Sequence, residues 1–265
     1  GKMKLEYSGQ LGIKSKPEFA FRPMTTSELF KAQQDYGRIV GGSANTNTNM
    51  PGWYYYKDNP RYATLSAADQ ARADVIYDSM SKINTNWSDY FFRQGSFSNH
   101  QITLSGGTGK TRVYSSVALY NEEGTTKRTD MKRVTVRNNM DYADEKLSLS
   151  VSSNLGYTKR NFQQSTVTNG LGNPFLVTNI AVPYHLPYKA DGSYNNGVGA
   201  KYVATTQLDL TKFDENYNDQ LKATIGFNLN YKITEDLTAS LVTGIDFRET
   251  QNTTYQSREA FTRTP

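Results

Sequence analysis

Residues 146–158 read Lys-Leu-Ser-Leu-Ser-Val-Ser-Ser-Asn-Leu-Gly-Tyr-Thr, and apolar and polar residues alternate along most of this stretch. Successive side chains of a β-strand point to opposite faces, so a period of two predicts a strand with one apolar and one polar face. The apolar face carries Leu147, Leu149, Val151, Leu155 and Tyr157. A tilted strand with an apolar face of about ten residues matches the hydrocarbon thickness of a membrane. The stretch therefore predicts a strand that crosses a membrane.

The same alternation recurs along the chain and predicts seven strands. They are expected at residues 2–13, 99–105, 111–120, 133–142, 146–158, 221–232 and 237–248, with less clean faces in the second and third. The pattern places Leu149, Leu229 and Ile245 toward lipid. It places Ser150, Asn228 and Asp246 toward a wet interior. The predicted fold is all-β, an antiparallel transmembrane β-barrel segment.

The expected connections differ in length on the two rims. Short turns are expected at residues 106–110, 143–145 and 233–236, and longer or polar connections at 14–98, 121–132, 163–220 and from 249 onward. An antiparallel meander reverses at each connection, so all the short turns share one rim. Outer-membrane barrels have short periplasmic turns and long extracellular loops. Aromatic girdles are expected from Tyr142 and Tyr231 on the turn side and from Tyr157 and Phe247 on the loop side.

The first long loop is expected to contain two helices. Thr25 and Glu28 have the spacing of a capping box and predict a helix over residues 27–36. Ser66 precedes a second predicted helix over residues 67–82, with an apolar stripe of Ala68, Ala71, Val75 and Ile76. Residues 41–60, rich in Gly, Asn and Pro, are expected to be irregular. A long loop with structure of its own is usually functional.

Composition excludes several classes of function. The chain of 265 residues is 36% hydrophobic and carries a net charge of +5, but its Lys and Arg residues are scattered and form no nucleic-acid module. Cysteine is absent, and His100 and His185 lie far apart, so we expect neither a disulfide nor a metal site. There is no apolar run long enough for a membrane helix and no signal peptide. Residue 1 is Gly, so we expect a chain processed or cut from a longer one.

No motif predicts catalysis. Ser105-Gly-Gly-Thr-Gly-Lys-Thr111 imitates a phosphate-binding loop, but Leu104 stands where that motif needs Gly, and a strand follows instead of a helix. A Gly-rich hairpin turn explains it better. Acidic pairs such as Asp214 with Glu215 fit solvated turns. We therefore predict no enzyme, no catalytic residues and no cofactor.

One run in the first long loop is a candidate substrate contact. Trp53, Tyr54, Tyr55 and Tyr56 are consecutive, and aromatic faces can stack on sugar rings. The alternative is that these residues pack the loop onto itself or onto a partner protein.

Several segments resemble SusC/RagA-type TonB-dependent transporters of Bacteroidetes. They are Arg22-Pro-Met-Thr-Thr-Ser-Glu-Leu-Phe30, Trp87-Ser-Asp-Tyr-Phe-Phe-Arg-Gln-Gly-Ser-Phe97, the Leu104-Ser-Gly-Gly107 turn and the strand from Tyr114 that ends in Tyr-Asn-Glu-Glu-Gly124. The resemblance runs in order through residues 1–265 and implies the first part of a 22-stranded barrel, just after the plug. It further implies outer-membrane import of glycans or oligopeptides, a SusD-like surface lipoprotein as lid, and energy from TonB acting through the plug.

The chain also departs from that family, since it shows no TonB box, no plug and none of the later strands. We therefore expect it to depend on the remaining segments of the same transporter and on outer-membrane lipid. Two alternatives stay open. One is a passive outer-membrane pore or a surface adhesin that binds glycans, and the other is a soluble, secreted β-sandwich that binds glycan.

Overall fold

The computed structural model describes residues 2–163 and 173–261. The chain divides into two compact units. The first, here called the wall unit, comprises residues 1–16, 93–163 and 215–256. The second, here called the loop unit, comprises residues 17–92, 164–214 and 257–265.

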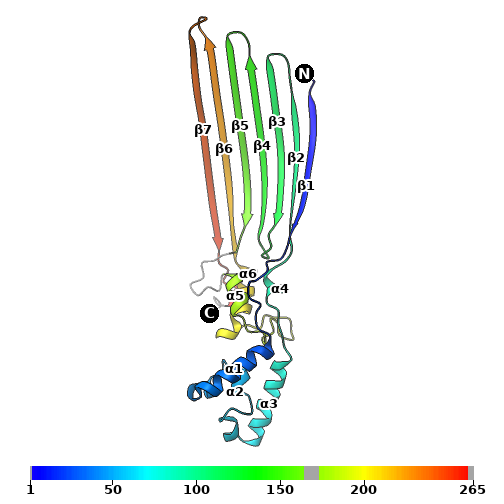
Figure 1. Ribbon diagram of the computed structural model, residues 1–265, viewed down its shortest axis with the longest axis vertical. Helices are drawn as coiled ribbons and strands as arrows, with labels where there is room; N and C mark the ends of the chain where they lie inside the picture. The colour runs from blue at the N-terminus through cyan, green and yellow to red at the C-terminus, as the bar shows by residue number, and fades with distance from the viewer. Residues whose placement is uncertain (1, 164–172, 262–265) are drawn as a thin grey trace. The chain divides into compact units, whose positions relative to one another are not determined.

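The wall unit is a single antiparallel sheet of seven strands in the order β1-β2-β3-β4-β5-β6-β7, so every strand pairs with its neighbours in sequence (Figure 1). The strands are β1 (Lys4–Lys14), β2 (Gly95–Gly107), β3 (Thr111–Glu123), β4 (Asp130–Ala143), β5 (Leu147–Asn161), β6 (Glu215–Lys232) and β7 (Thr238–Tyr255). No second sheet packs against this one within the described ranges. That arrangement contradicts the β-sandwich alternative, in which apolar faces would be pressed together.

The observed strands extend further than their apolar alternation. At the short-turn ends the predicted bounds agree with the structure to within two residues. At the other ends β6 starts at Glu215 rather than 221, and β7 continues to Tyr255 rather than 248. Polar residues fill these extensions, and cross-strand pairing continues through them, for example between Asn216 and Thr254. Backbone pairing needs no apolar side chain, so the alternation marks only the apolar band of each strand.

The short turns lie where they were expected. Residues 105–111, whose sequence is similar to a phosphate-binding loop, form a hairpin turn. A 2.7 Å hydrogen bond from the Thr108 amide to the Thr111 carbonyl closes it. In the next turn the carboxylate of Asp144 accepts bonds from the Leu147 amide at 2.8 Å, the Tyr142 hydroxyl at 2.8 Å and the Lys146 amide at 3.0 Å. These hydrogen bonds lower the pKa of Asp144 to about 2, and the bond from the Leu147 amide contributes most.

One connection on the opposite rim is shorter than predicted. Residues 121–132 were expected to form a loop, but β3 and β4 pair as far as Glu123 and Asp130. A tight turn joins them, in which the Gly124 amide donates to the Thr129 carbonyl at 2.8 Å and Arg128 has a φ of 60°. The prediction was wrong because polar residues were read as loop where the backbone ladder continues.

The loop unit is mainly helical. Its helices are α1 (Thr26–Val40), α2 (Pro51–Tyr54), α3 (Ala67–Ser81), α4 (Ser88–Phe91), α5 (Pro174–Ile180) and α6 (Val203–Phe213). Residues 41–60, expected to be irregular, contain α2 and a 3-10 helix at Gly42–Thr46. Among the described residues no helix has both the length and the apolar character needed to cross a membrane.

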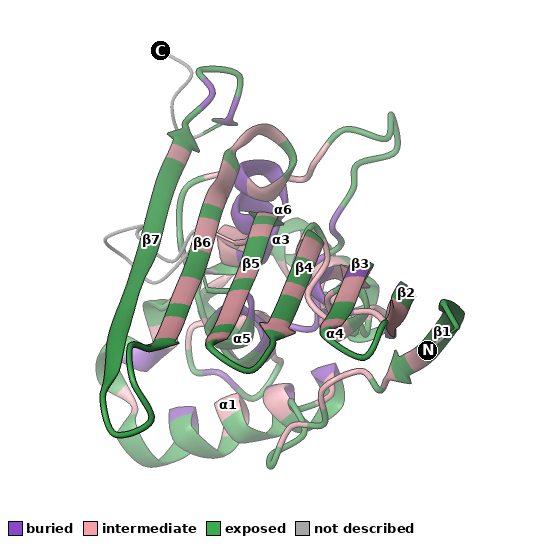
Figure 2. Ribbon diagram, turned by 90° about the horizontal axis from the view of Figure 1, so that it is seen from above, coloured by how far each residue is buried: buried purple, intermediate pink, exposed green. Residues whose placement is uncertain are grey.

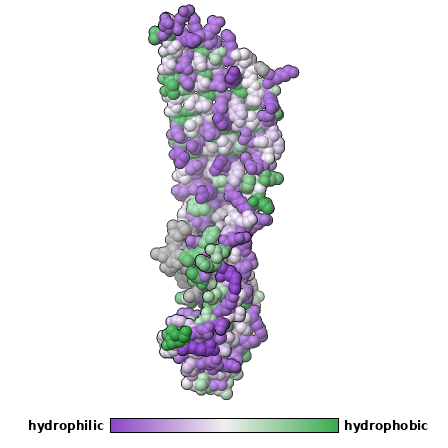
Figure 3. Space-filling view, in the orientation of Figure 1, coloured by the Kyte–Doolittle hydropathy of each residue, from purple (hydrophilic) through white to green (hydrophobic). Residues whose placement is uncertain are grey.

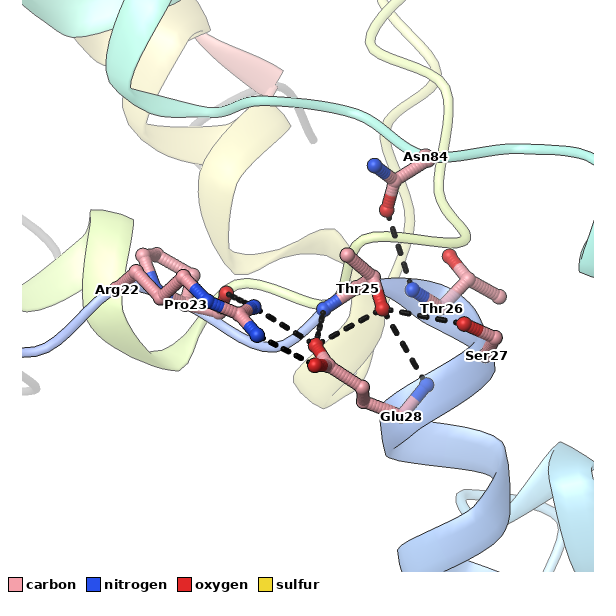
Figure 4. Close-up of polar contacts among 7 residues, drawn as sticks. All are labelled: Arg22, Pro23, Thr25, Thr26, Ser27, Glu28 and Asn84. Carbon is pink, nitrogen blue, oxygen red and sulfur yellow. Dashed lines mark hydrogen bonds and ion pairs between the residues drawn. The ribbon is translucent and has the colours of Figure 1, made fainter.

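The predicted capping box begins α1 (Figure 4). The Glu28 amide donates to Thr25 Oγ1 at 3.3 Å, and the Thr25 amide donates back to the Glu28 carboxylate at 2.8 Å. Arg22 reaches the same carboxylate at 2.8 Å. The Arg22 hydrogen bond is the main reason why the pKa of Glu28 lies well below its usual value. The side-chain oxygen of Asn84 then accepts from the Thr26 amide at 3.1 Å, which ties α1 to the segment after α3.

The buried face of α3 is not the predicted stripe. Ser66 caps the helix as expected, by accepting from the Asp69 amide. Ala73 is buried, whereas Val75 is 68% exposed, and Ala68 and Ala71 are exposed as well. Apolar spacing alone misassigned the face, because Tyr77, on the same side as Ala73, packs against the ring of Phe30 at 5.2 Å.

Candidate functional site: a two-faced sheet and its helical loops

The register aligns the apolar residues of all seven strands on one face of the sheet. Leu149 of β5 lies opposite Leu229 of β6, and Leu229 lies opposite Leu241 of β7. In a second row Tyr7, Ile102, Val117, Val136, Leu155, Ala223 and Phe247 follow one another across the sheet. Directly opposed residues of an antiparallel pair share a face, so these rows form one continuous apolar surface. Large side chains in it are solvent-accessible, with Leu5 at 72% and Ile245 at 63%.

A polar row interrupts this apolar face near its middle. Ser115 lies opposite Asn138, which lies opposite Ser153, and the row continues into Ile225. Period-two reading of single strands had not singled out this row. It becomes visible only when the register brings the three side chains together.

The other face is mainly polar, although Phe97 of β2 and Val242 of β7 lie on it. Ser150 lies opposite Asn228, and Asp246 lies opposite Thr224, whose hydroxyl is 3.4 Å from the Asp246 carboxylate. In the view of Figure 3 hydrophilic side chains predominate over the strands. The faces predicted for Leu149, Leu229 and Ile245, and for Ser150, Asn228 and Asp246, agree with the register.

At the rim opposite the short turns the apolar band ends in a row that contains Tyr157, and a row with charged residues follows it. Tyr157 lies opposite Val134 and Leu221, and its hydroxyl donates to Asp219 at 2.5 Å. The next row on this face places Lys132 directly opposite Lys159. An aromatic residue followed by charges is the order expected where a barrel wall passes from hydrocarbon into the polar interface.

A cavity of about 1090 Å³ lies at the same rim of the wall unit, lined by residues of β1–β5 and of the β3–β4 turn. Glu122 lies in it, ion-paired with Lys14 and bonded by the Tyr120 hydroxyl at 2.6 Å. Arg93 also lines it, and donates to the Gly124 carbonyl at 3.1 Å. This part of the Tyr-Asn-Glu-Glu-Gly motif therefore ties the first barrel strands together. No sequence pattern had indicated this cavity.

The aromatic run of the first loop is divided between packing and exposure. Trp53 is 2% exposed, and its Nε1 donates to the side-chain oxygen of Asn45 at 2.9 Å. Tyr56 packs against Tyr77 at 5.7 Å. Tyr54 and Tyr55 are half-buried and contact each other edge to face, with the Arg61 guanidinium 4.0 Å from the Tyr54 ring centroid. A ligand role for the run stays a prediction, and the accessible candidates for it are the tyrosines.

The segment that starts at Trp87, one of those that carry the family resemblance, contributes to the core of the loop unit. This core consists of Trp87, Phe91, Phe92, Val177, Ala204 and Leu208. The Trp87 indole donates to the Val182 carbonyl at 2.9 Å and stacks on His185 at 6.2 Å. Burial lowers the pKa of His185 and raises that of Tyr184 to about 12. In the described ranges no cluster of His, Asp or Glu could hold a metal ion.

This geometry defines a class: a segment of barrel wall with an apolar exterior, a polar interior and structured loops on one rim. No family model matches the chain. Over 174 residues it is 26% identical to TonB-dependent receptor P3 of Formosa agariphila, in a match that covers 63% of this chain and 17% of that protein.

Solved structures show the same fold. The RagAB peptide transporter has a TM-score of 0.62 at 16% identity, covering 94% of this chain and 28% of the other. The RagAB peptide importer in its open-open state has a TM-score of 0.65 at 17% identity, covering 96% and 28%. The same importer in its closed-closed state has a TM-score of 0.64 at 16% identity, and the match covers 98% of this chain and 30% of the other. The chain thus spans about a sixth of the curated relative and less than a third of these chains.

The predicted resemblance to SusC/RagA-like transporters is therefore confirmed, in sequence by the receptor and in fold by the RagAB chains. The sheet has the fold of a seven-stranded segment of a β-barrel wall. These relatives are described as a receptor and as a peptide transporter, not as enzymes.

Proposed function

We propose that the chain forms part of the wall of a TonB-dependent transporter that imports glycans or oligopeptides across the outer membrane of a Bacteroidetes-like bacterium. One observation carries this proposal: the register places exposed apolar residues of all seven strands on one face and polar residues on the other. Leaving so large an apolar surface exposed to water is unfavourable, whereas contact with acyl chains stabilises it. The polar face then lines the wet lumen.

The loop unit supplies the second part of the proposal. Its segments are inserted into the chain between β1 and β2, between β5 and β6, and after β7, all at the rim opposite the short turns. In an outer-membrane barrel this rim is extracellular. We place substrate contacts and the SusD-like lipoprotein there, with Tyr54, Tyr55 and Tyr56 as candidates and Trp53 as their buried support. The plug and the remaining barrel strands would complete the transporter, with TonB acting through the plug.

The face assignment can be tested with one cysteine at a time, since this chain has none of its own. Leu229→Cys and Asn228→Cys would be made in the full transporter in native outer membranes, otherwise free of cysteine. We expect a water-soluble maleimide to label position 228 and a membrane-dissolved maleimide to label position 229. Labelling of position 229 from water at the rate of position 228 would contradict a lipid-facing apolar surface.

Import itself is tested by uptake of labelled glycans and peptides in cells with and without TonB. Active import predicts uptake that is lost when either the transporter gene or TonB is deleted. Uptake that needs the transporter but continues without TonB would indicate a passive pore. Binding of cells to glycan without any uptake would indicate an adhesin.

A further inference from the structure

Basic side chains are unequally divided between the two faces of the wall unit. The polar face carries Lys4, Lys14, Arg112, Arg133, Arg137, Arg160, Lys222, Lys232 and Arg248, against the acids Glu6, Glu122, Asp141 and Asp246. The apolar face carries Lys132 and Lys159 against Glu123, Asp130, Glu215, Asp219 and Glu249. The positive charge of the sheet is therefore concentrated on the polar face.

Two of these basic residues form an opposed pair. Lys222 of β6 lies directly opposite Arg248 of β7. Like charges at directly opposed positions destabilise a sheet. Among the described residues neither side chain has an ion-pair partner. Asp246, the nearest acid on this face of β7, lies beside the Thr224 hydroxyl instead.

The space beside Lys222 on β5 is open. Gly156 lies opposite Lys222 on β5, and a Cβ placed there would meet only the Val134 carbonyl, at 3.9 Å. On β4, which β5 separates from β6, Arg137 lies 5.9 Å from the ring centroid of Tyr114 and Arg133 lies 6.0 Å from that of Tyr120. Guanidinium groups bind carboxylate and sulfate through paired hydrogen bonds, and aromatic rings support planar or sugar groups beside them.

We propose that Arg133, Arg137, Lys222 and Arg248, here called the basic stripe, select cargo that carries repeated anionic groups such as carboxylates or sulfates. This inference rests on the proposed function, because it requires the polar face to line the lumen. A lumen wall with an excess of basic over acidic side chains raises the local concentration of anionic solutes. The stripe thus favours acidic peptides or acidic glycans over their neutral counterparts, and anionic charge is the property that the two share.

The local potential can be measured without knowing the cargo. In the full, otherwise cysteine-free transporter, Gln220→Cys places a thiol two residues from Lys222 on the same face. The rates of reaction with an anionic and with a cationic methanethiosulfonate give a ratio that reports the potential. We expect Lys222→Glu with Arg248→Glu to lower the anionic-to-cationic ratio by about tenfold. Gly156→Glu, which keeps both basic residues and adds an acid beside them, should lower it by a smaller factor.

The chain offers a matched control on the opposite face. Lys132 and Lys159 are also directly opposed across two strands, so their double reversal to Glu changes the net charge equally and removes a similar repulsion. It should leave the reagent ratio at position 220 unchanged. An unchanged ratio in the Lys222 and Arg248 double variant, or an equal change in the control, would overturn the proposal.

Uptake then separates the two sources of anionic cargo. Cells would be offered oligoglutamate against oligoglutamine, and oligogalacturonate against a neutral hexose oligomer of equal length. One of these two pairs, peptide or glycan, is the one that the transporter takes up. For that pair we expect Lys222→Glu with Arg248→Glu to lower uptake of the anionic oligomer about tenfold more than uptake of the neutral one. Equal losses for both members would show that the stripe holds another segment of the transporter, and would overturn anion selection. If uptake continued without TonB and still favoured the anionic oligomer, the proposed active import would be wrong, but the proposed anion selection would stand.

Discussion

Asn228 and Leu229 are adjacent in β6 yet face different surroundings, the polar and the apolar surface of the sheet. Arginine at position 229 would place a charge against hydrocarbon. Because Leu229 lies two residues from the girdle residue Tyr231, we expect Leu229→Arg to destabilise the full barrel by less than the cost of about 2–4 kcal/mol typical of the bilayer midplane, but by more than the cost of about 0–1 kcal/mol typical of the interface. Asn228→Arg should cost much less, because the lumen hydrates the new charge. Equilibrium unfolding of both variants in lipid vesicles measures the difference. Equal costs would contradict the assigned faces.

Trp53 and Tyr55 are two residues apart, but we expect substitution of Trp53 to affect stability and substitution of Tyr55 to affect substrate binding. Trp53 is almost completely buried, so Trp53→Ala should destabilise the loop unit by about 3–5 kcal/mol. Tyr55 is half-buried, and Tyr55→Ala should leave the fold intact while weakening substrate binding. Amide hydrogen exchange of the loop unit measures the first effect, and a binding titration of the full transporter measures the second. Unchanged binding in Tyr54→Ala, Tyr55→Ala and Tyr56→Ala would remove the run from the list of ligand contacts.

His185 makes the stability of the loop unit depend on pH. Burial, together with the charge of Lys201, lowers its pKa from the ordinary 6.5, although the bond between Nε2 and the Asn195 carbonyl opposes the shift. The unfolded chain therefore binds a proton more readily than the folded one. The contribution of neutral, buried His185 to the stability of the loop unit is therefore fully present above pH 6.5. It is lost progressively as the pH falls below that value.

This dependence can be read from amide hydrogen exchange around residues 184–188 between pH 7.5 and 5.5. Protection should fall with acidity, and a His185→Phe variant compared at each pH should lack the dependence. Identical profiles for the two proteins would show that another group is responsible.

At the scale of elements, period-two alternation was sufficient to predict the strands and their faces. Residues 146–158 and 221–232 show why, since nearly every apolar side chain there meets an apolar neighbour across the ladder, as Val151 meets Phe227. Ile225, which lies opposite Ser153, is the exception in this ladder. The strand ends were not predictable in the same way. Glu215–Gln220 and Thr250–Tyr255 pair through their backbones while their side chains are polar, so composition does not mark them.

Contacts between distant segments account for the remaining differences. The buried face of α3 depends on Phe30 packing against Tyr77, which no local pattern in residues 67–82 contains. Trp53 is buried because α1 approaches it at Gly37, where a Cβ would lie 2.4 Å from the indole ring. The basic stripe likewise joins residues of separate strands, and only the register shows that Lys222 and Arg248 are opposed.

At the scale of the whole molecule the sheet leaves two edges. Within the part of the chain that the structure describes, β1 and β7 each pair on one side only, and nearly all of their residues are exposed (Figure 2). In hydrocarbon every unpaired amide or carbonyl costs several kilocalories per mole, and in water such an edge pairs with other chains. Closure by further strands removes both costs at once.

The isolated chain should therefore not be an independent folding unit. Expressed alone, we expect it to aggregate in plain buffer or to require detergent, since the exposed apolar face and the two free edges both favour association. The same residues within the full transporter should be monodisperse in detergent, which supplies the control. Size-exclusion chromatography with light scattering measures both. A stable, monodisperse monomer of the isolated chain in plain buffer would mean that its apolar face can be buried without lipid, and the wall assignment would fail with it.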